Sequence, residues 1–116
     1  MLDLSVNTFN DAHQSYRHKC IGGYSPVKLQ RYQDLIERYI SGEISSVYKA
    51  TEGCATVGEL EDNLPYLRVT SMLNGKYIIL GEDLAPVVND YAFGNCWFVN
   101  DAREASSVND EVDFLA

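Results

Sequence analysis

The chain has 116 residues, a length that suits one domain spanning residues 1–116, because either half alone would be short of a core. Hydrophobic residues make up 46% and aromatic residues 11%, which excludes a disordered chain, and no apolar run is long enough to cross a membrane. Acidic residues outnumber basic ones by 17 to 9, and the resulting net charge of −8 opposes direct binding to nucleic acid or to an anionic membrane.

The first part of the chain is expected to be mainly helical. Leu2, Leu4 and Val6 alternate with polar residues, which predicts a short half-buried strand. A threonine with capping potential then opens a predicted helix over residues 8–20. A second helix is predicted over residues 25–42, because a proline fits its first turn and apolar residues follow at helical spacing.

The spacing of apolar residues next changes to one that is typical of strands. Residues 46–51 and 54–57 predict two strands on either side of a Glu-Gly turn. Residues 68–80 predict a hairpin, because an Asn-Gly pair at 74–75 separates two apolar runs. Both central residues of such a turn take positive φ, which asparagine and glycine tolerate best.

The rest of the chain predicts short elements. Residues 58–63 indicate a turn or one helical turn, residues 82–91 a short helix, and residues 101–107 another helical turn. Cys-Trp-Phe-Val at 96–99 has the composition of a buried strand. Together these elements predict an α+β domain in which N-terminal helices pack on a small antiparallel sheet that contains the 68–80 hairpin.

Cysteine and histidine content bounds the redox and metal chemistry. Cys20, Cys54 and Cys96 are an odd number without a C-x-x-C pair, so we expect reduced thiols. Since the first residues lack the basic and apolar blocks of a secretory signal, we expect a cytoplasmic protein, in the host cytoplasm if phage-encoded. His13 and His18 lie near Cys20 in the sequence. The two histidines are five residues apart, however, and on a helix this spacing points their side chains in different directions. We therefore expect no metal and no cofactor.

The segment around Cys96 offers an alternative. Gly94-Asn95-Cys96-Trp97 resembles the nucleophile segment of papain-like cysteine proteases and of transglutaminases, which implies a cysteine nucleophile with a histidine base. In both families the histidine follows the cysteine, whereas here both histidines precede it. The alternative function is thus a small cysteine- or metal-dependent enzyme or ligand-binding domain that uses Cys96 or the group His13, His18 and Cys20.

The negative charge is concentrated in the second part of the chain. Residues 1–50 hold six basic and five acidic residues, whereas residues 51–116 hold three basic and twelve acidic ones. No phosphate-binding loop, dinucleotide-binding glycine pattern or hydrolase motif is present in the sequence. Carboxylates spaced along a rigid domain can imitate the phosphates of a nucleic-acid duplex and attract a basic protein surface.

These features favour a small acidic protein-binding inhibitor over an enzyme. By analogy of size and charge, we expect a phage anti-defence protein of the anti-CRISPR or anti-restriction type, or an immunity protein, that occludes a basic nucleic-acid-binding surface of its target. We expect no catalytic residue. A third hypothesis is a homodimer that buries tyrosines at its interface. The expected partner-binding residues are six acids: Glu59, Glu61, Asp62, Glu82, Asp83 and Asp90.

Overall fold

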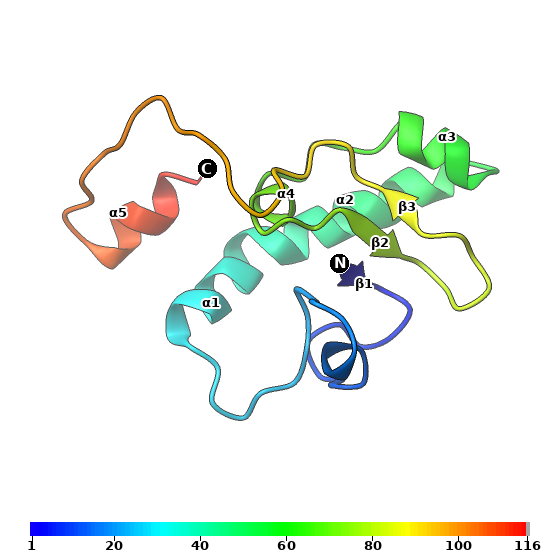
Figure 1. Ribbon diagram of the computed structural model, residues 1–116, viewed down its shortest axis with the longest axis horizontal. Coiled ribbons are helices and arrows are strands. Elements are labelled where there is room, and N and C mark those ends of the chain that lie inside the picture. The colour runs from blue at the N-terminus through cyan, green and yellow to red at the C-terminus, as the bar shows by residue number, and fades with distance from the viewer. Residues whose placement is uncertain (116) are drawn as a thin grey trace.

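The computed structural model describes residues 1–115 and contains a small mixed sheet with the order β1-β2-β3 (Figure 1). Strand β1 (Leu2–Asp3) pairs parallel with β2 (Tyr77–Ile79), and β2 pairs antiparallel with β3 (Val87–Val88). The expectation of an antiparallel sheet is therefore wrong for β1. A long connection that contains helices separates β1 from β2, and only such a crossover lets two strands run in the same direction.

One long helix supports this sheet. It comprises α1 (Gln30–Leu35), a π-helical turn η2 (Ile36–Ile40) and α2 (Ser41–Glu52), which follow one another without a break. Figure 1 shows it passing behind the sheet, and its buried side chains join the core formed by the strands. The core cluster consists of Leu2, Leu4, Ile21, Ile36, Ile40, Val47, Leu60, Leu67, Val69, Ile78 and Val87.

Shorter helices are distributed along the whole chain and are not confined to its N-terminal part. They are the 3₁₀ turn η1 (Gln14–Tyr16), α3 (Val57–Asp62), α4 (Arg68–Met72) and α5 (Val108–Asp113). The combination of helices with a small sheet confirms the α+β class. Within residues 1–115, no helix has the length and the apolar character that a membrane crossing requires.

The predicted helix over residues 8–20 is wrong, and only the η1 turn forms there. Thr8 does not cap a helix: its hydroxyl donates to the carbonyl of Asp3 at 2.7 Å, and its own carbonyl accepts from Gly23 N at 2.7 Å. A Cβ on Gly22 would lie 2.0 Å from that carbonyl oxygen, so a glycine is required there. These bonds close the segment into a loop, which competes with a helix.

The strands predicted at residues 46–51 and 54–57 are also wrong: residues 46–51 lie in α2, which continues through Gly42 to Glu52, and residues 54–56 form the bend that leads into α3, which begins at Val57. Ile40, Ile44 and Val47 recur at helical spacing and pack on or against the core. Burial of this stripe outweighs the local preference for strand, and a single glycine in a helix costs only about 1 kcal/mol.

The predicted 68–80 hairpin is wrong because its first half is helix α4. Asn74 has a φ of +56°, its N–H donates to Ser71 O at 3.0 Å, and Gly75 N donates to Thr70 O at 2.7 Å. These two bonds form a Schellman motif, so the Asn-Gly pair ends a helix and does not turn a hairpin. The hairpin of the structure lies one strand later, between β2 and β3.

Residues 82–91 form a loop and β3 in place of the predicted helix, and the turn or helical turn predicted at 58–63 is confirmed by α3. The predicted strand at 96–99 and helical turn at 101–107 are absent from the described chain. This segment pairs with no strand of the described sheet, and Phe98 is fully exposed and Trp97 nearly half exposed. The last helix begins instead at Val108.

Candidate functional site: an acidic end with an apolar groove

Helix α3 begins with a reciprocal cap. Thr56 Oγ1 accepts a hydrogen bond from Glu59 N at 3.2 Å, and Glu59 Oε2 accepts one from Ala55 N at 2.8 Å. The threonine thereby satisfies an N–H group that the first helical turn leaves free, and the glutamate binds the N–H of the residue before the cap. The cap fixes the Glu59 carboxylate, with its charge, at the start of α3.

The other two acids of α3 differ in their surroundings. Glu61 Oε1 accepts a hydrogen bond from Val88 N at 2.8 Å, which ties α3 to strand β3. Asp62, next to it, is exposed and has no hydrogen bond within residues 1–115. Glu61 is therefore both a charge and a structural contact, whereas Asp62 is a charge alone.

The loop between β2 and β3 carries the next two candidate acids. Leu84 N donates to Gly81 O at 3.4 Å, which closes a four-residue turn with Glu82 and Asp83 at its two corners. Both carboxylates are exposed. The side chain of Leu84 folds back toward Gly81, yet 53% of Leu84 remains exposed.

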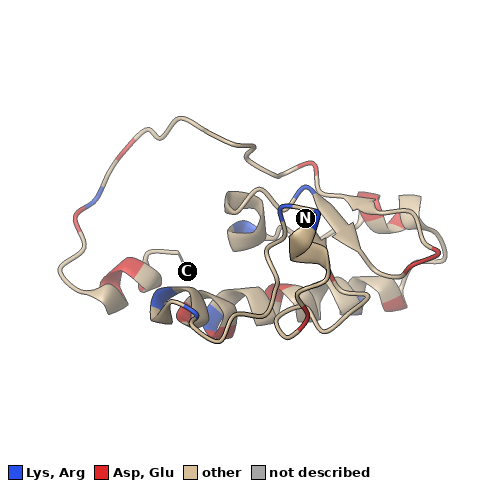
Figure 2. Cartoon of the chain, turned by 60° about the horizontal axis from the view of Figure 1, so that its bottom comes forward, with Lys and Arg blue, Asp and Glu red and all other residues tan. Residues whose placement is uncertain are grey.

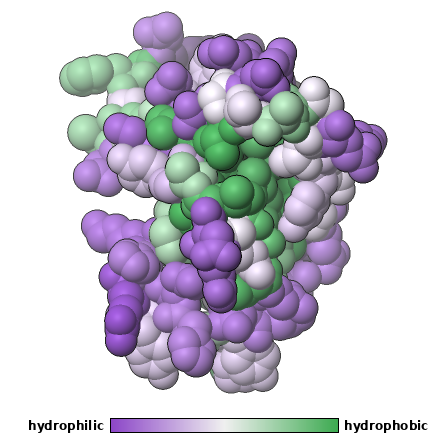
Figure 3. Space-filling view, turned by 90° about the vertical axis from the view of Figure 1, so that its right-hand side faces the viewer, coloured by the Kyte–Doolittle hydropathy of each residue, from purple (hydrophilic) through white to green (hydrophobic). Residues whose placement is uncertain are grey.

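Helix α3 and this loop lie at the same end of the molecule, on the right in Figure 1, and Figure 2 shows acidic residues on both. Between them, at the C-terminal end of α2, lies a groove of about 160 Å³. The space-filling view of this end shows apolar side chains surrounded by hydrophilic ones (Figure 3). The groove is lined by Thr51, Cys54, Ala55, Thr56, Val57, Leu60, Leu80 and Leu84.

Sequence reasoning missed this groove. Its lining comes from α2, α3 and the β2–β3 loop, and residues 46–57 were expected to be strands and residues 82–91 a helix. In the sequence, nothing distinguishes Leu60 and Leu84 from leucines of the core. The available signal was the pair Leu84 beside Asp83, an apolar residue at the tip of an acidic turn.

The charge at this end is not neutralised by the protein itself. Residues 52–67 and 77–89 hold six acidic residues and no lysine or arginine. In the described part of the chain none of the six is in an ion pair, whereas Glu111 and Asp113 of α5 pair with Arg31 and Arg38 at the other end, at 3.6 and 3.1 Å. Internal ion pairs thus neutralise two acids of α5 and none on α3 or the β2–β3 loop.

Asp90 is placed apart from the other candidates. It is exposed and follows β3 at the end opposite to the β2–β3 loop, next to the buried Asn89. The structure thus brings five of the six expected acids to one end of the molecule: Glu59, Glu61, Asp62, Glu82 and Asp83.

The residues of the alternative site do not form a cluster. His13 and His18 are exposed, and the described residues contain no group of three metal-ligating side chains. Cys20 is half-buried and lies near Tyr32, whose hydroxyl donates to the Ile21 carbonyl. The burial of Tyr32, and to a smaller degree the neighbouring Cys20, raise the pKa of Tyr32. Cys96 is exposed and lies in an irregular segment, not at the start of a helix as in the two families that its sequence resembles.

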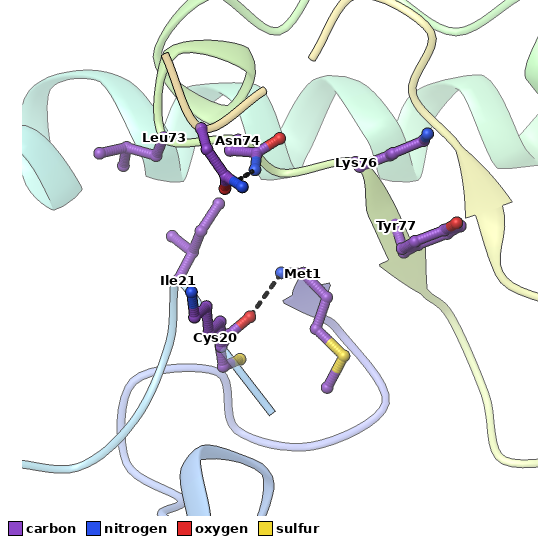
Figure 4. Close-up of a pocket in the computed structure, with 9 residues that line it drawn as sticks. Met1, Cys20, Ile21, Leu73, Asn74, Lys76 and Tyr77 are labelled. Carbon is purple, nitrogen blue, oxygen red and sulfur yellow. Dashed lines mark hydrogen bonds between the residues drawn. The ribbon is translucent and has the colours of Figure 1, made fainter. Parts of the chain in front are cut away.

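Cys20 also lines a second cavity, of about 360 Å³, between the N-terminal segment and the end of α4 (Figure 4). Several polar groups around it bind one another: the Met1 amino group donates to the Lys19 carbonyl at 2.7 Å, and Asn74 Nδ2 donates to Asn95 Oδ1 at 3.1 Å. Neither histidine lines this cavity. Cys20 therefore has no histidine base among the residues that line this cavity.

Comparison with known proteins finds no match: no protein-family model fits the chain, and no curated protein or solved structure is similar to it. The chemistry of the surface is therefore the ground for a functional argument. Its most distinctive part is the acidic end, which we define as α3 together with the β2–β3 loop and the groove between them.

Proposed function

We propose that the protein is a small inhibitor that binds another protein through its acidic end and covers a basic, nucleic-acid-binding surface of that target. The target is a nuclease or another nucleic-acid enzyme, as with anti-CRISPR, anti-restriction and immunity proteins. The observation that carries the proposal is the unpaired charge: five carboxylates on α3 and the β2–β3 loop, with no lysine or arginine in either segment.

Physical chemistry supports a basic partner for this surface. Backbone hydrogen bonds hold the carboxylates of Glu59 and Glu61 in position, so a partner does not have to order these two on binding. A concentrated field of one sign speeds the encounter with an oppositely charged surface and repels nucleic acid, which the inhibitor must exclude. Binding is therefore expected to be fastest at low salt.

The test is a charge reversal that leaves the fold intact. Glu59 and Glu61 hold backbone hydrogen bonds, so the informative variant is the double substitution Glu82→Lys and Asp83→Lys, at exposed corners without such bonds. We expect affinity capture from a lysate of the source cells to retain a nucleic-acid enzyme with the natural protein and to lose it with this variant. The captured enzyme should be inhibited, and duplex DNA or RNA should compete with the inhibitor.

A matched control distinguishes the effect of charge at the acidic end from the effect of the net charge of the molecule. Asp101→Lys with Glu104→Lys changes the net charge equally but lies on the irregular segment before α5. This control is expected to retain the target. Equal loss with both variants, or a target whose inhibited surface is not basic, would contradict the proposal.

A further inference from the structure

We infer that the groove at the acidic end is a receptor for one aromatic side chain that is flanked by lysine or arginine on the partner. This inference rests on the proposed function and specifies what the partner's surface must carry. It assigns the binding site to the apolar groove, with the acids around it as the source of charge complementarity.

The groove has the size and lining of a site for one side chain. Its volume is about 160 Å³, and an apolar cavity of roughly 150 Å³ accommodates a benzene ring. Leu60, which is only 3% exposed, and the half-buried Val57 and Leu80 are apolar lining residues. Leu84, at 53% exposure, is a lining residue that a bound ring would cover further.

The charges around the groove determine which residues of the partner should lie beside that aromatic side chain. The Glu59 carboxylate binds the N–H of Ala55, a lining residue, and Glu82 and Asp83 directly precede Leu84. Glu52, at the end of α2, follows another lining residue, Thr51. No lysine or arginine lines the groove, so cations on the partner find carboxylates on more than one side.

Basic nucleic-acid-binding surfaces carry this combination of groups. They place aromatic side chains, on which bases stack, among lysines and arginines that contact phosphates. A groove that takes the aromatic side chain while its rim takes the cations would remove both kinds of contact at once. Acidic surface charge alone would compete only for the cations.

Two synthetic peptides of equal charge test the inference on the full chain: acetyl-Lys-Lys-Phe-Lys-Lys-amide and the same peptide with glycine in place of phenylalanine. In an amide NMR titration at low salt, we expect the phenylalanine peptide to bind roughly tenfold more tightly, because a ring is partly buried. The largest shifts are expected in residues 51–60 and 80–84, which surround the groove.

Substitutions then locate the binding site. Ala55→Leu fills the groove from its exposed edge and should reduce binding of the phenylalanine peptide to the level of the glycine peptide. Ala85→Leu, an exposed loop position that does not line the groove, is the matched control and should change nothing. The amide spectra of the free variants check that each remains folded.

The possible results are distinguishable. Equal affinity for both peptides, no binding of either, or a dimer of the protein that Ala55→Leu dissociates would each overturn the groove inference. If both peptides bind equally and Glu82→Lys with Asp83→Lys abolishes binding, the proposed function stands without the groove. If that variant leaves binding of the phenylalanine peptide unchanged while Ala55→Leu abolishes it, the groove stands and the electrostatic proposal fails.

Discussion

At the scale of single residues, Glu43 joins two helices. Its carboxylate, on α2, accepts hydrogen bonds from Val69 N at 2.7 Å and from both the N–H and the hydroxyl of Thr70, at 2.9 and 2.7 Å. Val69 and Thr70 are fully buried, so water cannot replace the carboxylate. This glutamate supplies the N-terminal cap that α4 lacks in its own sequence.

We therefore predict that Glu43→Ala lowers the free energy of unfolding by about 3 kcal/mol, because it leaves buried donors without an acceptor. Chemical denaturation measures this loss. Glu43→Gln retains one acceptor oxygen and should lose less. Glu52→Ala, on the exposed end of the same helix, is the control and should stay within about 0.5 kcal/mol of the natural protein. An equal effect at Glu43 and Glu52 would refute the capping role.

At the scale of elements, two serines hold the start of α5. Ser107 caps the helix by accepting from Asp110 N at 3.1 Å, and Ser106 Oγ donates to Asp110 Oδ2 at 2.5 Å. The side-chain hydrogen bond from Ser106 and then that from Ser107 lower the pKa of Asp110. A carboxyl group whose folded pKa is lowered stabilises the fold above its unfolded pKa, about 3.9, and loses this contribution as the pH falls through the folded value.

We predict that α5 loosens between about pH 4 and the lower pKa of Asp110, and that Ser106→Ala moves this midpoint upward. An NMR titration of the Asp110 side-chain carbon and of the α5 amides measures both effects. Asp110→Asn should remove this pH dependence, while Ser45→Ala, a hydroxyl on α2 that binds its own helix, should leave the Asp110 midpoint unchanged. A Ser106→Ala midpoint equal to that of the natural protein would contradict this assignment.

The elements also show what a sequence can and cannot predict here. Leu29, Tyr32 and Ile36 have helical spacing, and a helix does form over most of the expected range, although it begins at Gln30. The Asn-Gly pair at 74–75 predicts a hairpin as well as a helix end, because positive φ serves both. In the structure only Asn74 has positive φ, and the bond from Gly75 N to Thr70 O closes the end of α4.

The candidate site was predictable in part for a physical reason. Acidic residues are costly to bury, so their exposure follows from composition, and all six expected acids are exposed. Which of them lie together depends on how α3 packs against β3 and the β2–β3 loop, and local spacing carries no information on that packing. The groove depends on the same contacts, so neither its existence nor its position could be derived from the chain alone.

At the scale of the whole molecule, the fold is more open than its length requires. Its accessible surface is 8020 Å², whereas a compact domain of this mass exposes about 6,300 Å². The radius of gyration is 14.9 Å, against about 13 Å for an average domain, and the extents are 45 × 34 × 24 Å. The irregular chain between β3 and α5 contributes to this surface, and Figure 2 shows it looping away from the rest. Such a molecule gains stability from any partner that binds its folded state.

The bond from Val88 N to Glu61 has a consequence for how molecules of this protein meet one another. Strand β3 is an edge of the sheet, and a free outward N–H group on such an edge can pair with a strand of a second copy. The Glu61 carboxylate occupies the N–H of Val88 and places a charge beside the edge. We predict that Glu61→Ala aggregates faster than Asp62→Ala at equal concentration, as followed by light scattering and thioflavin fluorescence. Equal rates would show that Glu61 does not protect the edge, whereas faster aggregation of Glu61→Ala would show that Glu61 prevents strand pairing between copies.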